Sequence, residues 1–424
     1  MEKKSTIDHY RPDLHPFEDV YRDIHQNPEL SKQEVRTSSI AASHLEALGD
    51  FVVHQRIGGY GVVGVLSNGS GPTVLLRADM DALPHLEQTN LPYASTKTVT
   101  DAEGKSTPVM HACGHDLHVA TLMAAATLLH AAKSEWSGTL ICLFQPNEET
   151  AGGARAMVAD GLWDPKRYGI PTPDIVLGQH VHAIKAGVVA LSGGPILTAV
   201  DSLEVRIFGK SGHISRPDLC VDPVVTASHI VVRLQSLVTK EVRPEDFAII
   251  ACASIHGGTT ANIVPDFVDL KLSIRSYRSE VHGRLLAAVK RVVYAECEAS
   301  GSLKVHEPTF TTIMHAPATI NDIKSAEILK TAFRGYFGLN AIESDPFGAS
   351  EDFSILATSC GAPYVFHMYG CVDAERWDEA EKAGKVNEIP HNHSAFFAPV
   401  IQPTMRTAVD AFALAALTFL GEPS

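Results

Sequence analysis

The sequence predicts an α/β protein into which a smaller α+β module is inserted. Two observations lead to this prediction. In the first half of the chain, short apolar strand-like segments alternate with helix-like segments, which is typical of an α/β layer with a largely parallel sheet. From about Asp201 the order becomes strand, helix, strand, strand, helix, strand, and the chain then returns to helices and short apolar strands.

The elements of the first half can be assigned in order. Segments 60–69 and 72–81 (YGVVGVLSNG and PTVLLRADMD) are bounded by turn-forming residues and are expected to be strands. Segment 116–133 is rich in Ala and Leu and apolar on most faces, which predicts a buried helix. Segments 138–146 and 173–181 are short apolar runs and are expected to be further strands.

The inserted module has the element order of a ferredoxin-like fold. Its strands are predicted at 201–209, 247–258, 266–276 and 302–308, and its helices at 222–238 and 279–300. Asp222 precedes Pro223, which predicts a helix that begins there with Asp222 as its N-cap. Within 266–276, apolar and polar residues alternate strictly from Val268 to Arg275, as in a half-exposed antiparallel strand. The predicted module spans 198–312, so that 1–197 and 313–424 form the α/β domain.

The composition is that of an ordinary globular protein. Of 424 residues, 45% are hydrophobic and 20% are charged, and the net charge of −14 argues against nucleic-acid and anionic-membrane partners. The N-terminus has no apolar run that could be a secretory signal, and the apolar segment 408–421, interrupted by Asp410, is expected to be a buried helix. The seven cysteines have no paired framework spacing, which predicts reduced thiols in a cytoplasmic protein.

The densest group of potential ligands is HACGHDLH, residues 111–118. Cys113 and His115 are two positions apart and cannot share a helix face, but they can converge on one ion if Gly114 forms a turn between them. A zinc finger would need a second pair at similar spacing, which the sequence lacks. These residues alone leave three interpretations open: a metal-binding site, a thiol activated by a histidine, and a buried structural cysteine.

A pair of carboxylates follows the predicted strand 138–146. Glu148 and Glu149 lie at its carboxyl end, where open α/β sheets place their sites. Because the side chains of adjacent residues point apart, one carboxylate can bind a metal while the other accepts a proton from water. A solvated pair in a loop is the alternative.

Further candidates occupy similar positions. His180 ends a predicted apolar strand, with His182 two residues on, and a third cluster near the C-terminus contains His391 and His393. Asp79 and Asp81 follow the apolar run TVLL of the predicted strand, where an acidic residue can orient a metal-bound histidine. Each residue alone is more readily explained as a surface or structural group, but several clusters at strand ends favour a metal site.

Eight segments together resemble one known family in order and spacing. They are RADMDALP, MHACGHD, QPNEETAGGA, HVHA, SGHISRPD, TTANIVPD, GASEDFS and NHSAFF. The sequence resembles the amidohydrolase subfamily of the aminoacylase/carboxypeptidase-type metallopeptidases. That subfamily includes hippurate hydrolases, N-acyl-amino-acid amidohydrolases and plant hydrolases of auxin–amino-acid conjugates.

The resemblance implies a zinc-peptidase-like catalytic domain, an inserted ferredoxin-like lid and dimerisation domain, and a homodimer joined through the insert. It also implies two divalent metal ions per subunit, with Zn, Mn, Ni and Co as candidates. The implied ligands are Cys113, His115, Glu149, His180 and His393. The last is preferred to His391 because NHSAFF is similar to the family's His-Ser-Pro-aromatic stretch, with Ala395 where proline is usual. Glu148 matches the general base, and Asp81 matches the acidic residue that supports the metal centre.

Three residues of the insert match substrate-binding positions of the family. His213 resembles the histidine that reaches into a partner subunit's site to stabilise the oxyanion, and Asn262 and Arg275 resemble residues that grip a substrate carboxylate. The family's SGH motif commonly continues with Pro-His, whereas this chain has Arg216-Pro217-Asp218, a difference that bears on substrate preference.

The implied activity is hydrolysis of the linear amide bond of N-acyl or N-aryl-acyl amino acids by metal-activated water, with Glu148 as base. Three other functions are weighed against it: a dipeptidase or exopeptidase of the same fold, a metal-binding homologue without activity, and a cysteine hydrolase that uses Cys113. The presence of all five implied ligands and Glu148 argues against an inactive homologue.

Overall fold

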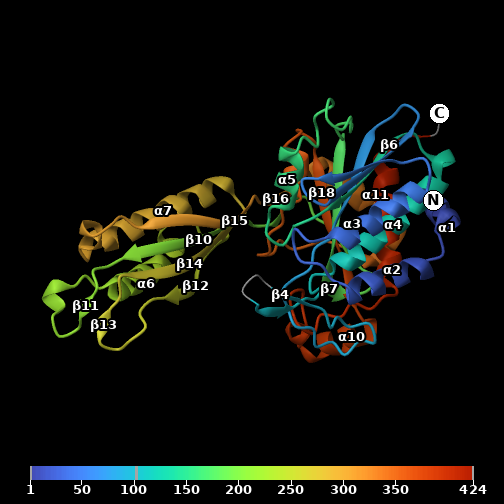
Figure 1. Ribbon diagram of the computed structural model, residues 1–424. Coiled ribbons are helices and arrows are strands. Elements are labelled where there is room, and N and C mark those ends of the chain that lie inside the picture. The colour runs from blue at the N-terminus through green and yellow to red at the C-terminus, as the bar shows by residue number, and fades with distance from the viewer. Residues whose placement is uncertain (1, 101–103, 423–424) are drawn as a thin grey trace. The chain divides into compact units, whose positions relative to one another are not determined.

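The computed structural model describes residues 2–100 and 104–422, which form two compact units (Figure 1). The first unit comprises Met1–Ile196, Ile320–Asp345 and Asp352–Ser424. The second comprises Leu197–Thr319 and Pro346–Glu351. The insertion of one unit into the other is therefore visible in the chain path, while the predicted boundaries at 198 and 312 stay a prediction.

The first unit is built on an eight-stranded sheet with the order β1-β2-β6-β3-β7-β18-β8-β17. Its strands are β1 (Val52–Ile57), β2 (Gly61–Asn68), β3 (Thr73–Asp79), β6 (Gly138–Gln145), β7 (Ile175–Lys185), β8 (Val189–Ala190), β17 (Ala341–Ile342) and β18 (Tyr364–Val372). The central strands β6, β3, β7 and β18 run parallel. However, β1, β2 and β6 pair antiparallel, as do β18 and β8, so the sheet is mixed rather than largely parallel.

Helices cover this sheet. They are α1 (Glu2–Tyr10), α2 (His15–Gln26), α3 (Val35–Ala47), α4 (His115–Ala131), α5 (Gly153–Ala159), α8 (Ile323–Phe337), α9 (Ser354–Thr358), α10 (Ala374–Ala383) and α11 (Thr404–Phe419). The helices α4 and α11 contact each other and the central strands, and nearly all their residues are buried (Figure 1). One large core joins them to alternate residues of the strands, such as Val74 and Leu76. The predicted buried helices are confirmed.

Asp410, the acidic residue inside the apolar helix α11, is paired with Arg11 and Tyr336. Asp410 accepts hydrogen bonds from Arg11 Nε at 2.7 Å and Arg11 Nη2 at 3.0 Å, and from the Tyr336 hydroxyl at 2.8 Å. A buried carboxylate requires such pairing, because burial of an isolated charge is strongly unfavourable. This pair links α11 to the segment that follows α1.

The second unit has a four-stranded antiparallel sheet with the order β12-β14-β10-β15. Its strands are β10 (Ala199–Phe208), β12 (Ala248–His256), β14 (Phe267–Ser276) and β15 (Thr309–Ala316), and its helices are α6 (Pro223–Glu241) and α7 (Ser279–Ala299). The ferredoxin-like order is confirmed, as is the N-cap: the Asp222 side chain accepts a hydrogen bond from Val224 N at 2.8 Å. In β14, Val268, Leu270, Leu272 and Ile274 are buried and the residues between them are not, as the alternation predicts, whereas Phe267 at the start of the strand is exposed.

The predicted last strand of the module is wrong. Residues Ser302–Lys304 form a 3-10 turn after Gly301, whose φ of +80° ends α7, and the strand begins only at Thr309. The Ser302 hydroxyl donates a hydrogen bond to the carbonyl of Phe208, which ties this turn to the end of β10. The strand itself contains three threonines, which favour β structure.

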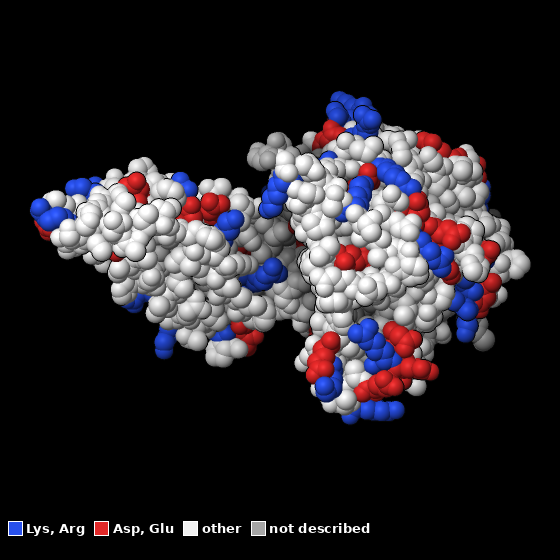
Figure 2. All heavy atoms as spheres, turned by 60° about the horizontal axis from the view of Figure 1, so that its bottom comes forward, with Lys and Arg blue, Asp and Glu red and all other residues white. Residues whose placement is uncertain are grey.

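The remaining short strands form two-stranded ladders: β4 (Thr98–Thr100) with β5 (Ser106–Pro108), β9 (Gly194–Leu197) with β16 (Thr319–Asn321), and β11 (Gly212–His213) with β13 (Ile263–Val264). All seven cysteines are free thiols. Within 2–100 and 104–422, the helices are each too short or too polar to cross a lipid bilayer. Basic and acidic side chains are interspersed on the face seen in Figure 2.

Candidate metal centre and active site

The candidate site lies at the ends of the central strands of the first unit, where polar residues follow the apolar ones. Strand β3 ends at Asp79, and β6 ends at Gln145, shortly before Glu148. The prediction that His180 ends its strand is wrong, because β7 continues to Lys185. His180 nevertheless faces the beginning of α4: its Nε2 lies 3.5 Å from Cys113 Sγ.

A glycine gives α4 its sharp beginning at this point. Gly114 adopts φ +87°, and a Cβ added to it would lie 2.4 Å from Val181 Cγ1. An L-residue would be strained by this backbone conformation and would also collide with β7. The turn brings Cys113 and His115 to the same place, as the spacing of HACGHDLH predicts.

The five residues that the sequence suggests as ligands lie together. The donor atoms of Cys113, His115 and Glu149 are all within 4.8 Å of one another. His180 adjoins Cys113, and His393 Nε2 lies 3.5 Å from Glu149 Oε2. His393 and the neighbouring His391 are both exposed. These side chains come from separate segments of the chain, so the fold brings them together.

The chemistry of this cluster fits a divalent metal. Neither ring nitrogen of His115 nor Oε1 of Glu149 has a hydrogen-bond partner among the described residues, although these atoms are buried. Burial raises the pKa of Glu149 to about 8, and burial also raises the pKa of the Cys113 thiol. A divalent cation would satisfy these atoms and would favour the deprotonated carboxylate and thiolate.

Asp81 holds the turn that carries the two glutamates. Its carboxylate accepts hydrogen bonds from the backbone N–H groups of Glu148 and Glu149, both at 3.0 Å, and from the Ser31 hydroxyl at 2.6 Å. Its Oδ1 also lies 3.4 Å from His115 Nδ1. Glu148 is buried, and its Oε2 lies 3.9 Å from His115 Nε2. Asp81 therefore links the end of β3 to the residues at which chemistry is expected.

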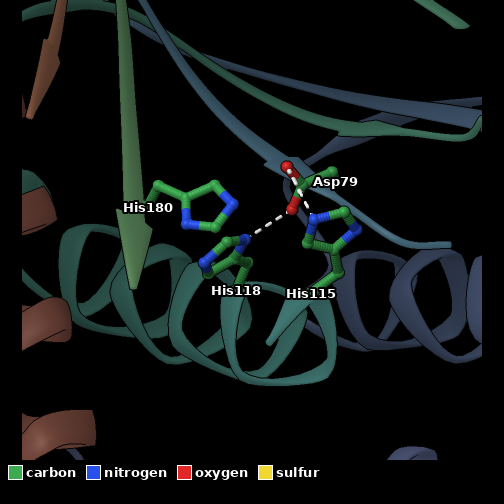
Figure 3. Close-up of side chains that lie close together, drawn as sticks. All are labelled: Asp79, His115, His118 and His180. Carbon is green, nitrogen blue, oxygen red and sulfur yellow. Dashed lines mark hydrogen bonds and ion pairs between the residues drawn. The ribbon is translucent and has the colours of Figure 1, made fainter. Parts of the chain in front are cut away.

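Two residues of this region are not among the five implied ligands, although Asp79 is a candidate to orient a metal-bound histidine. His118 and Asp79 lie beside His115 and His180 (Figure 3). The backbone N–H of Val181 donates to His118 Nε2 at 2.9 Å, so the proton of this imidazole is on Nδ1, which donates to Asp79 Oδ1 at 2.5 Å. Both nitrogens of His118 are thus engaged by protein atoms, which makes this histidine a scaffold for the site rather than a ligand.

Asp79 is in turn held by Arg77, which is fully buried in β3. Arg77 Nη1 donates to Asp79 Oδ2 at 2.6 Å, and Arg77 Nε donates to Gln145 Oε1 at 2.9 Å. Although burial opposes the charge, the Arg77 guanidinium keeps the pKa of Asp79 well below its usual range. The signal that could have revealed this network is an arginine within the apolar run TVLLRAD, because a buried charge needs a partner.

The three residues predicted to bind substrate all belong to the second unit. His213 pairs with Ile263 in the β11–β13 ladder, and Asn262 precedes this ladder: the backbone N–H of Ile214 donates to Asn262 O at 3.2 Å. Arg275 is elsewhere in the unit: its Nη1 donates to Gly348 O at 2.5 Å and to Ser350 Oγ at 3.0 Å. Asn262 and Arg275 therefore occupy different parts of the second unit.

Comparison with known proteins identifies the family. Residues 75–399 match the model of peptidase family M20/M25/M40. The chain is 35% identical to the hippurate hydrolase of Campylobacter jejuni over 354 residues (82% of this chain, 87% of that protein). It is 34% identical to the N-acetyl-L-cysteine deacetylase of Bacillus subtilis over 351 residues (82% of this chain, 79% of that protein).

A solved structure agrees over almost the full length. A Bacillus subtilis protein described as a dinuclear metal-binding peptidase of family M20 superimposes with a TM-score of 0.74 at 26% identity, over 96% of this chain and 98% of that one. Fold, motif order and sequence identity thus lead to one assignment. This chain is an amidohydrolase of peptidase family M20/M25/M40, a hydrolase that acts on amide bonds.

Proposed function

We propose that this enzyme cleaves the amide bond between a small acyl or aryl-acyl group and an amino acid, with two divalent metal ions per subunit. The observation that carries the proposal is the cluster of Cys113, His115 and Glu149 within 4.8 Å, next to a second carboxylate, Glu148, on the same turn. Both relatives are named for substrates that are amino acids with an acylated nitrogen, hippurate and N-acetyl-L-cysteine.

The residues that would hold the metals are Cys113, His115, Glu149, His180 and His393. A thiolate and imidazoles favour Zn, Ni or Co, and the carboxylate also admits Mn. Bound metal would supply Lewis-acid chemistry, lowering the pKa of water towards about 7 and polarising a carbonyl. The hydrogen bonds of His180 suit a metal ligand: its Nδ1 donates to Val181 O at 2.7 Å, which leaves the Nε2 lone pair directed towards Cys113.

Glu148 would transfer the proton. Its backbone is fixed by Asp81, so its carboxylate is held on the side of the turn next to Glu149 and close to His115. In this position Glu148 would accept a proton from the attacking water and return it to the amine nitrogen that leaves. Asp81 acts through the turn and takes no proton.

The second unit would contribute to substrate binding as a lid and as the dimerisation domain of a homodimer. The backbone N–H of Ser215 donates to His213 Nδ1 at 3.2 Å, so the neutral ring carries its proton on Nε2. That N–H is a donor suited to the oxyanion of an amide hydrolysis. Arg275 would bind the carboxylate of the amino-acid product, a role for which a guanidinium is well matched. Because Asn262 occupies a different part of the unit, it would join this carboxylate from the other subunit of the homodimer.

The alternative functions make different predictions. A cysteine hydrolase is disfavoured because burial raises the pKa of Cys113, whereas an attacking thiol needs a lowered pKa. A dipeptidase or exopeptidase of the same fold would use the same metals and Glu148, so only the substrate distinguishes it.

The test is a comparison of substrates at fixed metal content. The metal-loaded enzyme is assayed with N-benzoylglycine, several N-acetyl amino acids and several dipeptides, and kcat/KM is determined for each. We expect the best acylated amino acid to exceed the best dipeptide by about tenfold or more, a difference of about 1.4 kcal/mol in transition-state binding. A dipeptide preference would assign the enzyme to the peptidases of the family, and no turnover in either panel would contradict the proposal.

A further inference from the structure

Asn392, the residue before His393, bonds to two other segments of the site. Its side-chain nitrogen donates to the carbonyl of Cys113 at 3.0 Å and to the carbonyl of Val181 at 3.1 Å. An asparagine amide has two N–H donors, so both bonds can form at once. One side chain thereby bonds to the turn before α4 and to β7.

The peptide of Val181 is the point at which these bonds meet. Its carbonyl accepts from Asn392 and from His180 Nδ1, and its N–H donates to His118 Nε2 at 2.9 Å. The bond from His180 Nδ1 orients that imidazole. A displacement of this peptide would therefore turn the His180 ring away from Cys113.

The backbone next to Asn392 completes the link. The N–H of His393 donates to Ala112 O at 2.7 Å, so residues 392 and 393 both bond to the segment that carries Cys113. His393 has a φ of +68°, a left-handed conformation that non-glycine residues adopt only where their surroundings favour it. The bonds of Asn392 hold the chain in the conformation that directs His393 towards Glu149.

We propose that Asn392 is a positioning residue that fixes the segments of Cys113, His180 and His393 relative to one another and so sets the metal affinity of the site. Three of the five implied ligands depend on this one amide, while Asn392 itself takes no part in the proton transfers. The inference rests on the proposed metal centre and adds a residue to it.

The test compares Asn392→Ala with a matched control, Asn68→Ala. Asn68 has the same chemistry at a distance from the site: its side-chain nitrogen donates to Lys133 O at 2.7 Å and to Trp136 O at 2.6 Å. The full chain of each variant is titrated with Zn²⁺ against a competing chelator. Thermal unfolding is followed without metal, and absorption is recorded with Co²⁺, whose bands report coordination by the Cys113 thiolate. Asn392→Ser, whose hydroxyl can donate to only one of the two carbonyls, is the second variant.

We expect Asn392→Ala to weaken Zn²⁺ binding about 10- to 100-fold and to change the Co²⁺ spectrum, as loss of a residue that orients metal ligands typically does. Asn68→Ala should lower the midpoint of unfolding to a similar extent and leave Zn²⁺ affinity unchanged. If Asn392→Ala does not fold, the same loss is expected for Asn392→Ser. Wild-type affinity in either folded Asn392 variant, or an equal loss in Asn68→Ala, would overturn the inference. Failure of the proposed function is seen separately, as a wild-type chain that binds no metal or cleaves no acylated amino acid.

Discussion

The carboxylate of Asp81 accepts a hydrogen bond of 3.0 Å from the backbone N–H of Glu149. The same carboxylate accepts from the N–H of Glu148 and from the Ser31 hydroxyl. Three donors thus converge on two oxygens at the end of β3. This bond joins the turn after β6 to the segment that follows β3, although the two glutamates and Asp81 are far apart in the sequence.

Replacement of Asp81 by Asn tests this arrangement. The amide has one oxygen, and its NH₂ group would face a backbone N–H donor, so the turn should move. We expect Zn²⁺ affinity to fall about 10- to 100-fold. Ser31→Ala, which removes one of the three bonds and leaves both oxygens, should lower the affinity much less. Equal affinities in Asp81→Asn and the wild type would show that the turn does not depend on this carboxylate.

The adjacent glutamates should separate binding from catalysis. Glu148→Gln removes the proton acceptor and keeps its shape, so it should retain the metal and lower kcat about 10²- to 10⁴-fold. Glu149→Gln removes an implied ligand, so its main effect should be a loss of metal affinity. Metal content and kcat are measured on the same samples. Activity above a few per cent of wild type in metal-loaded Glu148→Gln would mean that another group is the base.

The stability of the protein should depend on pH through Glu34. This side chain is fully buried behind the site and accepts a hydrogen bond from Asn147 N at 2.7 Å. Burial raises the pKa of Glu34 to about 7, above its value in the unfolded chain. A raised carboxyl pKa contributes stability that is fully present below the unfolded pKa and is lost as the pH rises through about 7.

Glu34→Gln removes this titration. Between pH 5 and pH 8 the wild type should therefore lose about 1–3 kcal/mol more of its free energy of unfolding than the variant does. Urea unfolding at the two pH values, for both proteins without metal, measures the difference. Parallel pH profiles would show that Glu34 does not titrate in this range.

The Arg11–Asp410 pair should be important for the fold of the first unit. Arg11→Met removes the cation that hydrogen-bonds to the buried Asp410 carboxylate and leaves Arg406, whose Nε lies 3.8 Å from Asp410 Oδ2, as the nearest positive charge. This loss should cost about 3–5 kcal/mol. The double variant Arg11→Met, Asp410→Leu removes the charge as well and should recover most of this loss. The free energies of unfolding of the single and double variants are compared. A single variant as stable as the wild type would show that the remaining partners of Asp410, Tyr336 and Arg406, suffice.

The sequence predicted well those features that depend on local patterns. The alternation in β14, the N-cap of α6 and the buried helices α4 and α11 follow from periodicity and composition, and each is present. The position of Glu149 at the carboxyl end of β6 and the turn at Gly114 between Cys113 and His115 could be anticipated from the sequence, while the combination of these residues as one ligand set came from the family resemblance.

Features that depend on distant partners were not predicted. The role of His118 is decided by the backbone N–H of Val181, more than sixty positions away, and that of Asn392 by two carbonyls from other segments. The hydrophobic pattern around a histidine is the same whether its imidazole binds a metal or accepts a hydrogen bond from a backbone N–H. The mixed character of the sheet was also missed, because the direction in which β1, β2 and β8 pair depends on chain reversals rather than on strand composition.

The central claim is tested most directly by metal content and hydrolysis measured on one preparation, before and after chelation and after addition of Zn²⁺ or Mn²⁺. We expect about two metal ions per chain. Hydrolysis of an N-acyl amino acid should be lost on chelation and restored by metal, since the metal held by the proposed ligands would act as the Lewis acid. A chain that binds no metal, with hydrolysis indifferent to the chelator, would contradict this account and return Cys113 to consideration as a nucleophile.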